Sequence, residues 1–443
     1  MNGLLTDLYE LNMAASYLRR GMTGTATFSL FVRALPAARG FLVAAGIESC
    51  LDRLQDFRFE EDDIRYLRET QGYEARDLEA FRRLRFTGDV WAIPEGRIAL
   101  AGEPILEVTA PLPEAQLVET LLLNLVTFET TIASKAARCV IAASDRDVVD
   151  FSFRRTQGIE AGIDVARLSS MVGFAATSNV EAARRYGLVA AGTMAHSYIE
   201  AFAGEVEAFR AFAQDFPGRA TFLVDTYETV TGMKNAISVI KELGLSGRLG
   251  IRIDSGDLVA LSRRGRRLLD EAGLQSVRIF ASGGLDETSI EKLVAGGALI
   301  DAFGVGTRMG VSADHPYLDT AYKLVCYQGR PVMKLSHGKV SAPGRKQVFR
   351  RARPFGDLVG LYDENAPAGR ELLLEPVMAG GVRRTGRPPI TEANARFHAD
   401  LILLPAGARD LDRPRPPMAR PTPALRAMTA ETRRRLVAGR ARH

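Results

Sequence analysis

Seven short apolar runs recur between residues 148 and 307, and each is followed by a polar or glycine-rich cluster and then by a segment with helical spacing. Continuous apolar runs that alternate with helices are typical of parallel strands covered on both faces. Seven such units predict a closed or nearly closed α/β barrel. The runs are VVDFSFRR, VGFAATSN, LVAAGTMAHS, ATFLVDTYET, LGIRIDSGD, VRIFASGG and IDAFGVGT.

The polar cluster of every unit follows the carboxyl end of its predicted strand. Because the carboxyl ends of parallel strands open onto one face of a barrel, these clusters predict an active-site mouth. One cluster alone fits an ordinary turn or helix cap, whereas seven in phase are difficult to assign to caps alone. The mouth residues expected in this way are Arg154 and Arg155, Thr177, Ser178 and Asn179, Thr193 and His196, Asp225 and Thr226, Asp254, Ser255 and Asp257, Ser282, Gly283 and Gly284, and Gly304, Gly306 and Thr307.

The side chains of this mouth favour a ligand that carries phosphate. Glycine-rich turns that open onto helices present backbone N–H groups to phosphate, and ASGG and GVGT are two such turns. With arginines across the mouth, the two turns indicate a ligand with several phosphates. Asp254 and Asp257 fit magnesium or ribose binding as well as they fit capping of the next helix. His196 fits either a hydrogen-bonded structural residue or a nucleophile or base.

The length of 443 residues predicts two domains, because one compact core does not grow to that size. Helical, strand-like and turn-rich segments are mixed before the barrel, which indicates an α/β sandwich-like domain. We expect this domain to combine residues 1–120 with residues 321–408, and the barrel to occupy residues 121–320 between them. Residues 409–443 are expected to form a flexible Pro/Arg-rich tail.

The net charge of +5 originates in that tail. Residues 410–443 hold nine arginines and three acidic residues, so the rest of the chain carries a charge of −1. A solvated, disordered terminus is the favoured interpretation, and nucleic acid is not expected as a partner. Three scattered cysteines, no signal-peptide pattern and no uninterrupted apolar span predict a cytoplasmic protein that is not bound to a membrane.

Ten blocks of sequence, in the same order, resemble nicotinate phosphoribosyltransferases up to about residue 330. They are TDLYELNMAASY, FSLFVRALPAARGFLVAAGIE, LVETLLLNLVTFETTIASKAAR, FRRTQG, GFAATSNVEAARRYG, GTMAHSYIEAF, LVDTYET, IRIDSGDL, SGGLDE and IDAFGVGT. The resemblance implies an irregular, TIM-like α/β barrel with a sandwich-like domain. It also implies formation of nicotinate mononucleotide and pyrophosphate from nicotinate and phosphoribosyl pyrophosphate (PRPP) in NAD salvage. Magnesium, ATP hydrolysis coupled through a phosphohistidine, and a homodimer with the active site at its interface belong to the same expectation.

The resemblance also implies roles for individual residues. The phosphorylated histidine of the family lies in a GT(L/M)AHS motif, which corresponds to His196. Thr193 and Arg252 correspond to positions of the pyridine site, and Tyr9 corresponds to a tyrosine that reaches this site from the neighbouring subunit. The family usually has Asn or Asp where Gly284 stands. Together with the mouth pattern, the resemblance gives Arg154, Arg155, Ser282, Gly283, Gly284, Gly304, Gly306 and Thr307 as phosphate-binding residues, and Asp254 and Asp257 as ribose or magnesium ligands.

Three alternatives stay open from the sequence. Nicotinamide phosphoribosyltransferases share the histidine, and an aspartate thought to accept from the amide lies in the neighbourhood of Asp150; an unusual pyridine also fits. Quinolinate phosphoribosyltransferases are shorter and lack the histidine motif, so they are less favoured. A non-catalytic paralogue that binds a nucleotide is a different class of protein, and the presence of His196, Asp254 and Asp257 argues against it.

Overall fold

The computed structural model describes residues 3–336 and 341–440, and the chain divides into two compact units. The β-rich unit combines residues 1–131 with residues 317–443, and the barrel unit contains residues 132–316. The barrel unit is therefore inserted between the two segments of the β-rich unit.

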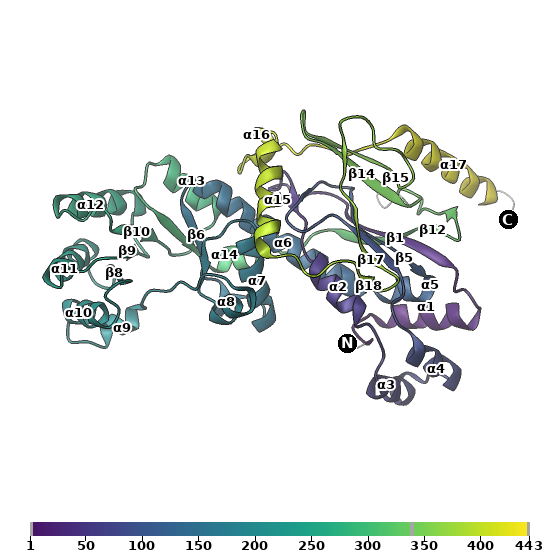
Figure 1. The fold of residues 1–443 in the computed structure, drawn as a ribbon, viewed down its shortest axis with the longest axis horizontal. Helices are drawn as coiled ribbons and strands as arrows, with labels where there is room; N and C mark the ends of the chain where they lie inside the picture. Colours follow the sequence, from purple (N-terminus) through teal and green to yellow (C-terminus); the bar gives the residue numbers. More distant parts are fainter. Residues whose placement is uncertain (1–2, 337–340, 441–443) are drawn as a thin grey trace. The chain divides into compact units, whose positions relative to one another are not determined.

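A seven-stranded sheet forms the larger layer of the β-rich unit (Figure 1). Its strands are β1 (Thr25–Val32), β3 (Asp89–Ala92), β5 (Pro104–Pro111), β12 (Thr320–Tyr327), β13 (Arg330–Pro331), β17 (Glu375–Ala379) and β18 (Val382–Arg383). They lie in the order β13-β12-β1-β5-β3-β17-β18, and every neighbouring pair is antiparallel. The interior strand β1 is almost entirely buried, and its Phe28 stacks on Tyr322 of β12 with 4.7 Å between ring centroids. Strands from both ends of the chain therefore share one core.

Two smaller sheets and eight helices complete this unit. The strands are β2 (Leu42–Val43), β4 (Ile98–Ala99), β14 (Lys346–Arg351), β15 (Gly356–Leu361), β16 (Glu371–Leu372) and β19 (Arg420–Pro421). The helices are α1 (Leu8–Arg19), α2 (Ile47–Gln55), α3 (Glu61–Gln71), α4 (Ala75–Arg83), α5 (Leu112–Leu117), α15 (Ile390–Leu403), α16 (Ala406–Arg409) and α17 (Pro423–Arg440). Strands β16, β14, β15 and β19 form a sheet in that order, and β2 pairs with β4.

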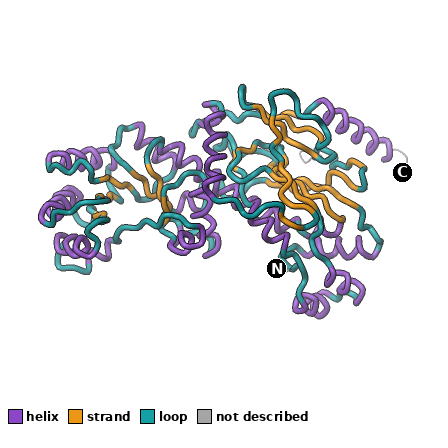
Figure 2. Tube along the Cα trace, viewed as in Figure 1, coloured by secondary structure: helices purple, strands orange, loops and turns teal. Residues whose placement is uncertain are grey.

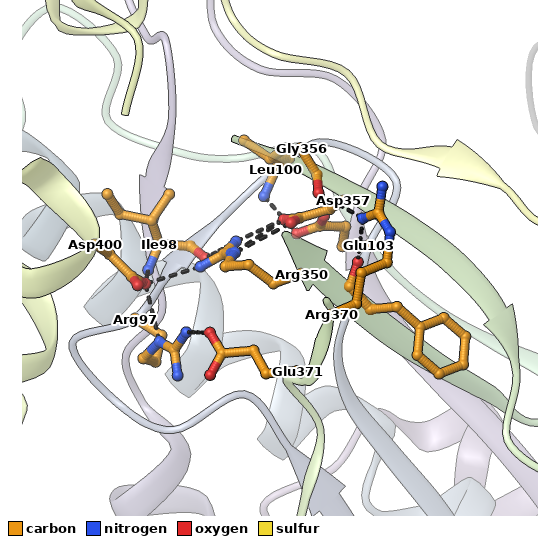
Figure 3. Close-up of polar contacts among 11 residues, drawn as sticks. Arg97, Ile98, Leu100, Glu103, Arg350, Gly356, Asp357, Arg370, Glu371 and Asp400 are labelled. Carbon is orange, nitrogen blue, oxygen red and sulfur yellow. Dashed lines mark hydrogen bonds and ion pairs between the residues drawn. The ribbon is translucent and has the colours of Figure 1, made fainter. Parts of the chain in front are cut away.

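A buried charge network ties β14, β15 and α15 together (Figure 3). The guanidinium of Arg350 lies 2.6 Å from Asp357 Oδ2 and 2.8 Å from Asp400 Oδ2. Asp400 also accepts hydrogen bonds from Arg97 Nε and from the backbone N–H of Ile98, both at 2.9 Å. Buried charges are tolerated when each is paired and hydrogen-bonded, and this network meets that condition for Arg350 and Asp400.

The tail differs from the flexible segment that the sequence predicted for residues 409–443. Residues 423–440 form α17, and Leu425 and Thr432, two turns apart, are buried. The backbone N–H of Thr422 donates to Val359 O at 2.9 Å, so the segment before the helix joins the edge of β15. The many prolines and arginines of this segment favoured a prediction of disorder, although Leu425 and Thr432 have the spacing of one helix face. Residues 441–443 lie outside the described residues.

Six parallel strands form the sheet of the barrel unit (Figure 2). They are β6 (Asp147–Asp150), β7 (Ala176–Thr177), β8 (Thr221–Leu223), β9 (Gly250–Ile253), β10 (Arg278–Ala281) and β11 (Ala302–Val305). They lie in the order β7-β6-β11-β10-β9-β8, and all five pairings are parallel. The helices are α7 (Ile159–Met171), α8 (Val180–Tyr186), α9 (His196–Glu200), α10 (Glu205–Asp215), α11 (Thr229–Glu242), α12 (Leu258–Glu271), α13 (Glu287–Ala295) and α14 (Thr307–Gly310). The predicted α/β class and irregular barrel are confirmed.

One of the seven apolar runs, LVAAGTMAHS, does not form a full strand. Ala190 makes one parallel bridge with Thr177, and residues 191–195 lie outside helices and strands. Glycine and alanine fit a pleated sheet poorly, which explains why this run departs from the other six. Within the described chain the sheet therefore ends at β8 on one side and at this bridge on the other, and the barrel is open rather than closed.

The long apolar segment of the sequence forms α6 (Glu119–Ala143), a helix of 25 residues. Its residues up to 131 belong to the β-rich unit and the later ones to the barrel unit. Among the helices of the described residues, none combines the length and the apolar character that crossing a membrane requires.

Candidate active site

A pocket of about 160 Å³ lies where the carboxyl ends of β6, β9, β10 and β11 meet. Its walls are formed by Phe151, Arg154, Arg155, Arg252, Asp254, Ser282, Gly283, Gly284, Gly304, Gly306 and Thr307. All of these residues except Phe151 were predicted from the sequence. Parallel strands place their carboxyl ends on the same side, which is why residues more than 100 positions apart meet here.

Arg252, near the end of β9, forms the centre of the pocket. Its Nε donates to Ser282 Oγ at 2.7 Å, and its Nη2 donates to Asp254 Oδ1 at 2.6 Å. Its Nη1 donates to Thr193 Oγ1 at 3.0 Å, so two predicted pyridine-site residues are in direct contact. The guanidinium carbon lies 5.4 Å from the centroid of the Phe151 ring. The pocket thus presents a cation held in one orientation next to an aromatic face.

Asp254 is half-buried beside this arginine. Burial alone would raise the pKa of its carboxyl group, but hydrogen bonds from Ser282 and Arg252 outweigh that effect and hold the pKa below its ordinary value. Asp254 is therefore ionised at neutral pH. Its backbone N–H donates to Asp225 Oδ2 at 2.9 Å, and the Ser255 hydroxyl donates to the same oxygen at 2.6 Å. Asp225 orders the loop that carries Asp254.

Asp257 has a different environment from Asp254, although magnesium or ribose binding and helix capping were both expected interpretations for either residue. Its Oδ1 accepts hydrogen bonds from the backbone N–H groups of Val259 and Ala260, both at 3.1 Å, and so it caps the N-terminus of α12. Among the residues that the structure describes, no group of three His, Cys, Asp or Glu side chains is placed to hold a metal ion. Asp257 thus caps α12, and Asp254 is the carboxylate that lines the pocket.

Two glycine turns form one wall of the pocket: the β10 turn (residues 282–286) and the β11 turn (residues 304–307). Gly283 has φ +97°, and a Cβ atom there would lie 1.9 Å from the backbone oxygen of Asp254. A Cβ atom at Gly304 would lie 2.8 Å from the ring of Phe151. Only glycine fits these two positions, so both turns pack closely against their neighbours at the pocket, Asp254 and Phe151.

Two arginines from the β6 end of the pocket complete its positive charge. Arg154 and Arg155 lie in a 3-10 turn, Phe153–Arg155, and both side chains are exposed. Arg155 Nη1 lies 3.4 Å from Thr307 Oγ1, across the pocket on the β11 turn. Within residues 3–336 and 341–440, neither arginine forms an ion pair with a carboxylate. Two guanidinium groups without a paired carboxylate in the described residues, beside the two glycine turns, make this wall suited to a polyanion.

His196 is the first residue of α9 and is partly buried. Its Nδ1 lies 3.1 Å from Thr226 Oγ1. The imidazole contributes to the lowering of the pKa of Asp254, so the two side chains are electrostatic neighbours. His196 does not line the pocket itself. The structure thus places it next to the pocket wall, with Nδ1 occupied by a hydroxyl group.

Tyr9 lies on α1 in the β-rich unit, and its side chain is half-exposed. Burial and the negative charges of Glu119 and Glu10 raise the pKa of its phenol group. It is not one of the residues that line the pocket of the barrel unit.

Asp150 ends β6 but is fully buried. Its Oδ1 accepts from the backbone N–H of Ser152 at 2.9 Å and from the Ser152 hydroxyl at 2.6 Å, and its Oδ2 accepts from the Thr177 hydroxyl at 2.7 Å. Burial raises the pKa of this carboxyl group. Asp150 therefore joins β6 to β7 and does not line the pocket.

Sequence reasoning did not single out Phe151, which forms the aromatic wall. Successive side chains of a strand point to opposite sides. Because Asp150 at the end of β6 is buried, the residue after it, Phe151, could have been expected to face the mouth. Asp225 was expected at the mouth but was not assigned a role, and its Oδ1 is buried without a hydrogen-bond partner among the described residues.

Comparisons with known proteins agree on one family. A model described as the nicotinate phosphoribosyltransferase N-terminal domain matches residues 4–127, and the model of the nicotinate phosphoribosyltransferase family matches residues 147–353. Nicotinate phosphoribosyltransferase pncB2 of Mycobacterium tuberculosis is 46% identical over 417 residues, covering 93% of this chain and 89% of that protein. The nicotinate phosphoribosyltransferase of Bacillus subtilis is 42% identical over 389 residues, covering 84% and 79%. The crystal structure of human nicotinic acid phosphoribosyltransferase is similar with a TM-score of 0.85 at 28% identity, covering 97% of this chain and 100% of that one.

Proposed function

Because this chain belongs to the nicotinate phosphoribosyltransferase family, we propose that it is an enzyme of NAD salvage that transfers the phosphoribosyl group of PRPP to nicotinate. The products are nicotinate mononucleotide and pyrophosphate. The observation that carries the proposal is the pocket in which Arg252 stands beside Phe151, with Arg154, Arg155 and the two glycine turns on its other walls.

Nicotinate is a flat aromatic ring with one carboxylate, and the pocket offers a matching pair of features. Arg252 supplies a positive charge for the carboxylate, and the face of Phe151 supplies an apolar surface for the ring. Hydrogen bonds to Thr193, Ser282 and Asp254 fix the guanidinium before the substrate arrives. Such preorganisation reduces the cost of ordering the site when the substrate binds.

Transfer of the phosphoribosyl group requires that the pyridine nitrogen lie in line with the anomeric carbon as pyrophosphate departs. The transition state resembles an oxocarbenium ion, and negative charge grows on the departing pyrophosphate. In this proposal Arg154, Arg155 and the β10 and β11 turns stabilise that charge, and their position in the pocket lining supports the assignment. The bond from the anomeric carbon to oxygen breaks, and the bond from that carbon to the pyridine nitrogen forms.

Magnesium fits this pocket as an ion held mainly by its substrate. The protein offers Asp254 at the pocket and the buried, unpartnered Oδ1 of Asp225 behind it. Mg²⁺ commonly binds one or two carboxylates together with substrate phosphates and water. When bound, it neutralises pyrophosphate charge.

We further propose that His196 accepts a phosphoryl group from ATP. With the proton on Nδ1 donated to Thr226 Oγ1, the lone pair of Nε2 is the nucleophile. The bond from Nε2 to the γ-phosphorus forms, the bond from that phosphorus to the ADP oxygen breaks, and ADP leaves. Attack by water on phosphorus later releases inorganic phosphate and restores the histidine. The added negative charge arises beside Asp254, where it can alter the phosphate-binding wall.

A homodimer in the cytoplasm, with Tyr9 contributing to a neighbouring subunit's site, completes the proposal. The apolar side chains Leu5, Leu8 and Tyr9 are each about half exposed at the start of α1, which supports a contact surface there. Light scattering of the wild type and of Tyr9→Ala tests the oligomeric state, and the KM for nicotinate tests the contribution of the tyrosine.

The first experiment measures turnover of the purified protein with PRPP and magnesium, with nicotinate or nicotinamide, in the presence and absence of ATP. We expect nicotinate mononucleotide and pyrophosphate to form in equal amounts, faster with ATP. The His196→Ala variant should retain basal transfer and lose the stimulation by ATP. A radiolabelled γ-phosphate that appears on the wild type but not on the variant would identify the phosphohistidine.

The nicotinamide alternative predicts turnover on the amide only. The buried position of Asp150, with three hydrogen bonds to Ser152 and Thr177, argues against it. Turnover on neither pyridine, with nucleotide binding retained, would instead indicate a non-catalytic paralogue.

A further inference from the structure

A buried cluster of charges lies in the barrel unit behind the two glycine turns. Glu287, the first residue of α13, directly follows the β10 turn and is 2% exposed. Lys135 Nζ lies 2.6 Å from Glu287 Oε2, and Arg138 Nε lies 2.9 Å from Glu287 Oε1. Lys135 and Arg138 occupy one face of α6 and are themselves buried. The helix that begins at the β10 turn is therefore attached to α6 by two buried ion pairs.

Lys135 also contacts the segment that follows the β11 turn. Its Nζ lies 2.8 Å from Asp314 Oδ1, beyond the end of α14. One ammonium group thus binds two carboxylates, and these carboxylates belong to the segments that follow β10 and β11. Neither carboxylate lines the pocket.

A second ion pair joins the same two segments closer to the pocket. Arg308, next to Thr307, donates through Nη1 to Asp286 Oδ2 at 3.0 Å. Asp286 also caps α13, with its Oδ1 accepting from the backbone N–H of Ser289 at 2.9 Å. The β10 and β11 turns are therefore linked twice, once near the pocket through Arg308 and once below it through Lys135.

We propose that Lys135 is a positioning residue for the phosphate subsite, and that through Glu287 and Asp314 it fixes the spacing between the β10 and β11 turns. The pocket needs N–H groups from both turns at distances that match a single pyrophosphate. A shift of about 1 Å in such a group is sufficient to reduce activity strongly. The inference rests on the proposed function, because it assigns these turns to the phosphates of PRPP.

The test replaces Lys135 with methionine, which has a similar length and no charge. We expect the KM for PRPP to rise roughly tenfold or more while the KM for nicotinate changes less than about twofold, because the Arg252 contacts do not involve Lys135. Pyrophosphate binding in the presence of magnesium, measured by calorimetry, should weaken by a similar factor. The Lys135→Arg variant keeps the charge and should recover most of the affinity.

Lys346→Met provides the matched control. Lys346 is also buried, lies in the β-rich unit, and has its Nζ 3.3 Å from Glu107 Oε1. Both substitutions remove one buried ammonium group, so both should lower stability, but only Lys135→Met should weaken pyrophosphate binding. Asp314→Asn is a milder second variant, because its partly exposed side chain allows folding if Lys135→Met does not fold.

The outcomes separate this inference from the proposed function. Wild-type protein that binds pyrophosphate but does not convert nicotinate would contradict the proposed function only. The positioning role is contradicted if folded Lys135→Met or Asp314→Asn binds pyrophosphate as the wild type does. It is also contradicted if Lys346→Met weakens pyrophosphate binding to the same extent. A wild type without any affinity for pyrophosphate would overturn both.

Discussion

Arg350 in the β-rich unit and Arg252 in the barrel unit both lie on strands, and both pair with aspartates. Arg350 is enclosed by Asp357 and Asp400 and is shielded from solvent (Figure 3). Arg252 pairs with one aspartate, and its side chain keeps 14% of its exposure at the wall of a pocket. An arginine–aspartate pair is thus enclosed by protein in one unit, and it lies at the wall of a pocket in the other. The difference is that a second aspartate pairs with Arg350, whereas Arg252 has one aspartate and remains partly exposed to a ligand.

The carboxyl groups of the two units show the same contrast. Burial raises the pKa of Glu10 to about 7, although hydrogen bonds from Thr6 and Thr120 act to lower it. Burial also raises the pKa of Glu103, beside Asp357, well above its ordinary value. At Asp254, hydrogen bonds from Ser282 and Arg252 outweigh burial and lower the pKa. Burial therefore favours the neutral form of Glu10 and Glu103 in the β-rich unit, whereas the hydrogen bonds of the pocket favour the charged form of Asp254.

The largest effect is expected for Arg350→Met. The substitution leaves Asp357 and Asp400 buried with less compensating charge, and breaking a buried pair in this way costs about 3–5 kcal/mol. Urea unfolding of the purified variant measures the loss. A loss below about 1 kcal/mol would mean that water reaches this network, and the contrast with Arg252 would disappear.

The second effect concerns activity. Arg252→Met should lower kcat/KM for nicotinate about 100-fold, because the substrate carboxylate loses its cation, and should lower stability less than Arg350→Met does. Steady-state kinetics and urea unfolding on the same preparation compare the two quantities. Equal stability losses in the two variants would show that Arg252 has a structural role like that of Arg350.

The third effect separates a helix cap from a metal ligand. Asp257→Ala should destabilise the protein by about 1 kcal/mol through loss of the cap of α12. Asp257→Asn keeps a capping oxygen, and we expect it to retain wild-type stability and an unchanged dependence of turnover on magnesium. A shift of that dependence in the asparagine variant would make Asp257 a magnesium ligand and would extend the open site beyond Asp254.

The last prediction concerns the pH dependence of stability. Because the pKa of Glu10 is raised from 4.5 to about 7 on folding, the folded state binds more protons than the unfolded state in this interval. Its contribution to stability is complete below about 4.5 and is lost as the pH rises through about 7. We expect Glu10→Gln to flatten the fall in unfolding midpoint between pH 5 and pH 8. An unchanged slope would mean that Glu10 is ionised in the fold.

The barrel mouth was predictable from the sequence because its residues follow strands at a constant phase. Asp254, Ser282 and Thr307 needed no knowledge of distant contacts to be assigned to one face, whereas Arg252 was assigned from the family resemblance. Local patterns therefore gave the architecture of the barrel unit and most of its pocket.

Other features depended on partners that are distant in sequence. The contact of Lys135 with Glu287 joins residues that only the completed barrel brings together. Asp254 and Asp257 had the same two interpretations in the sequence, ligand binding and helix capping, and their contacts differ: Asp254 accepts from Arg252, and Asp257 accepts from the backbone of α12. In α17, the burial of Leu425 and Thr432 outweighed a composition typical of disorder.

The open edge of the barrel has a consequence for motion. Residues 191–195, directly before His196, lie outside helices and strands. The bridge at Ala190 pairs the backbone of this stretch with the parallel sheet, and Arg252 of β9 donates side-chain hydrogen bonds to Thr193 and Met194. Segments with few backbone ladder bonds open locally at a lower free energy than the rest of a fold. Amide hydrogen exchange should therefore be faster at residues 191–195 than in β9 and β10. The residue proposed to carry the phosphoryl group directly follows this segment, so local opening there would change its exposure without unfolding the strands that carry the pocket.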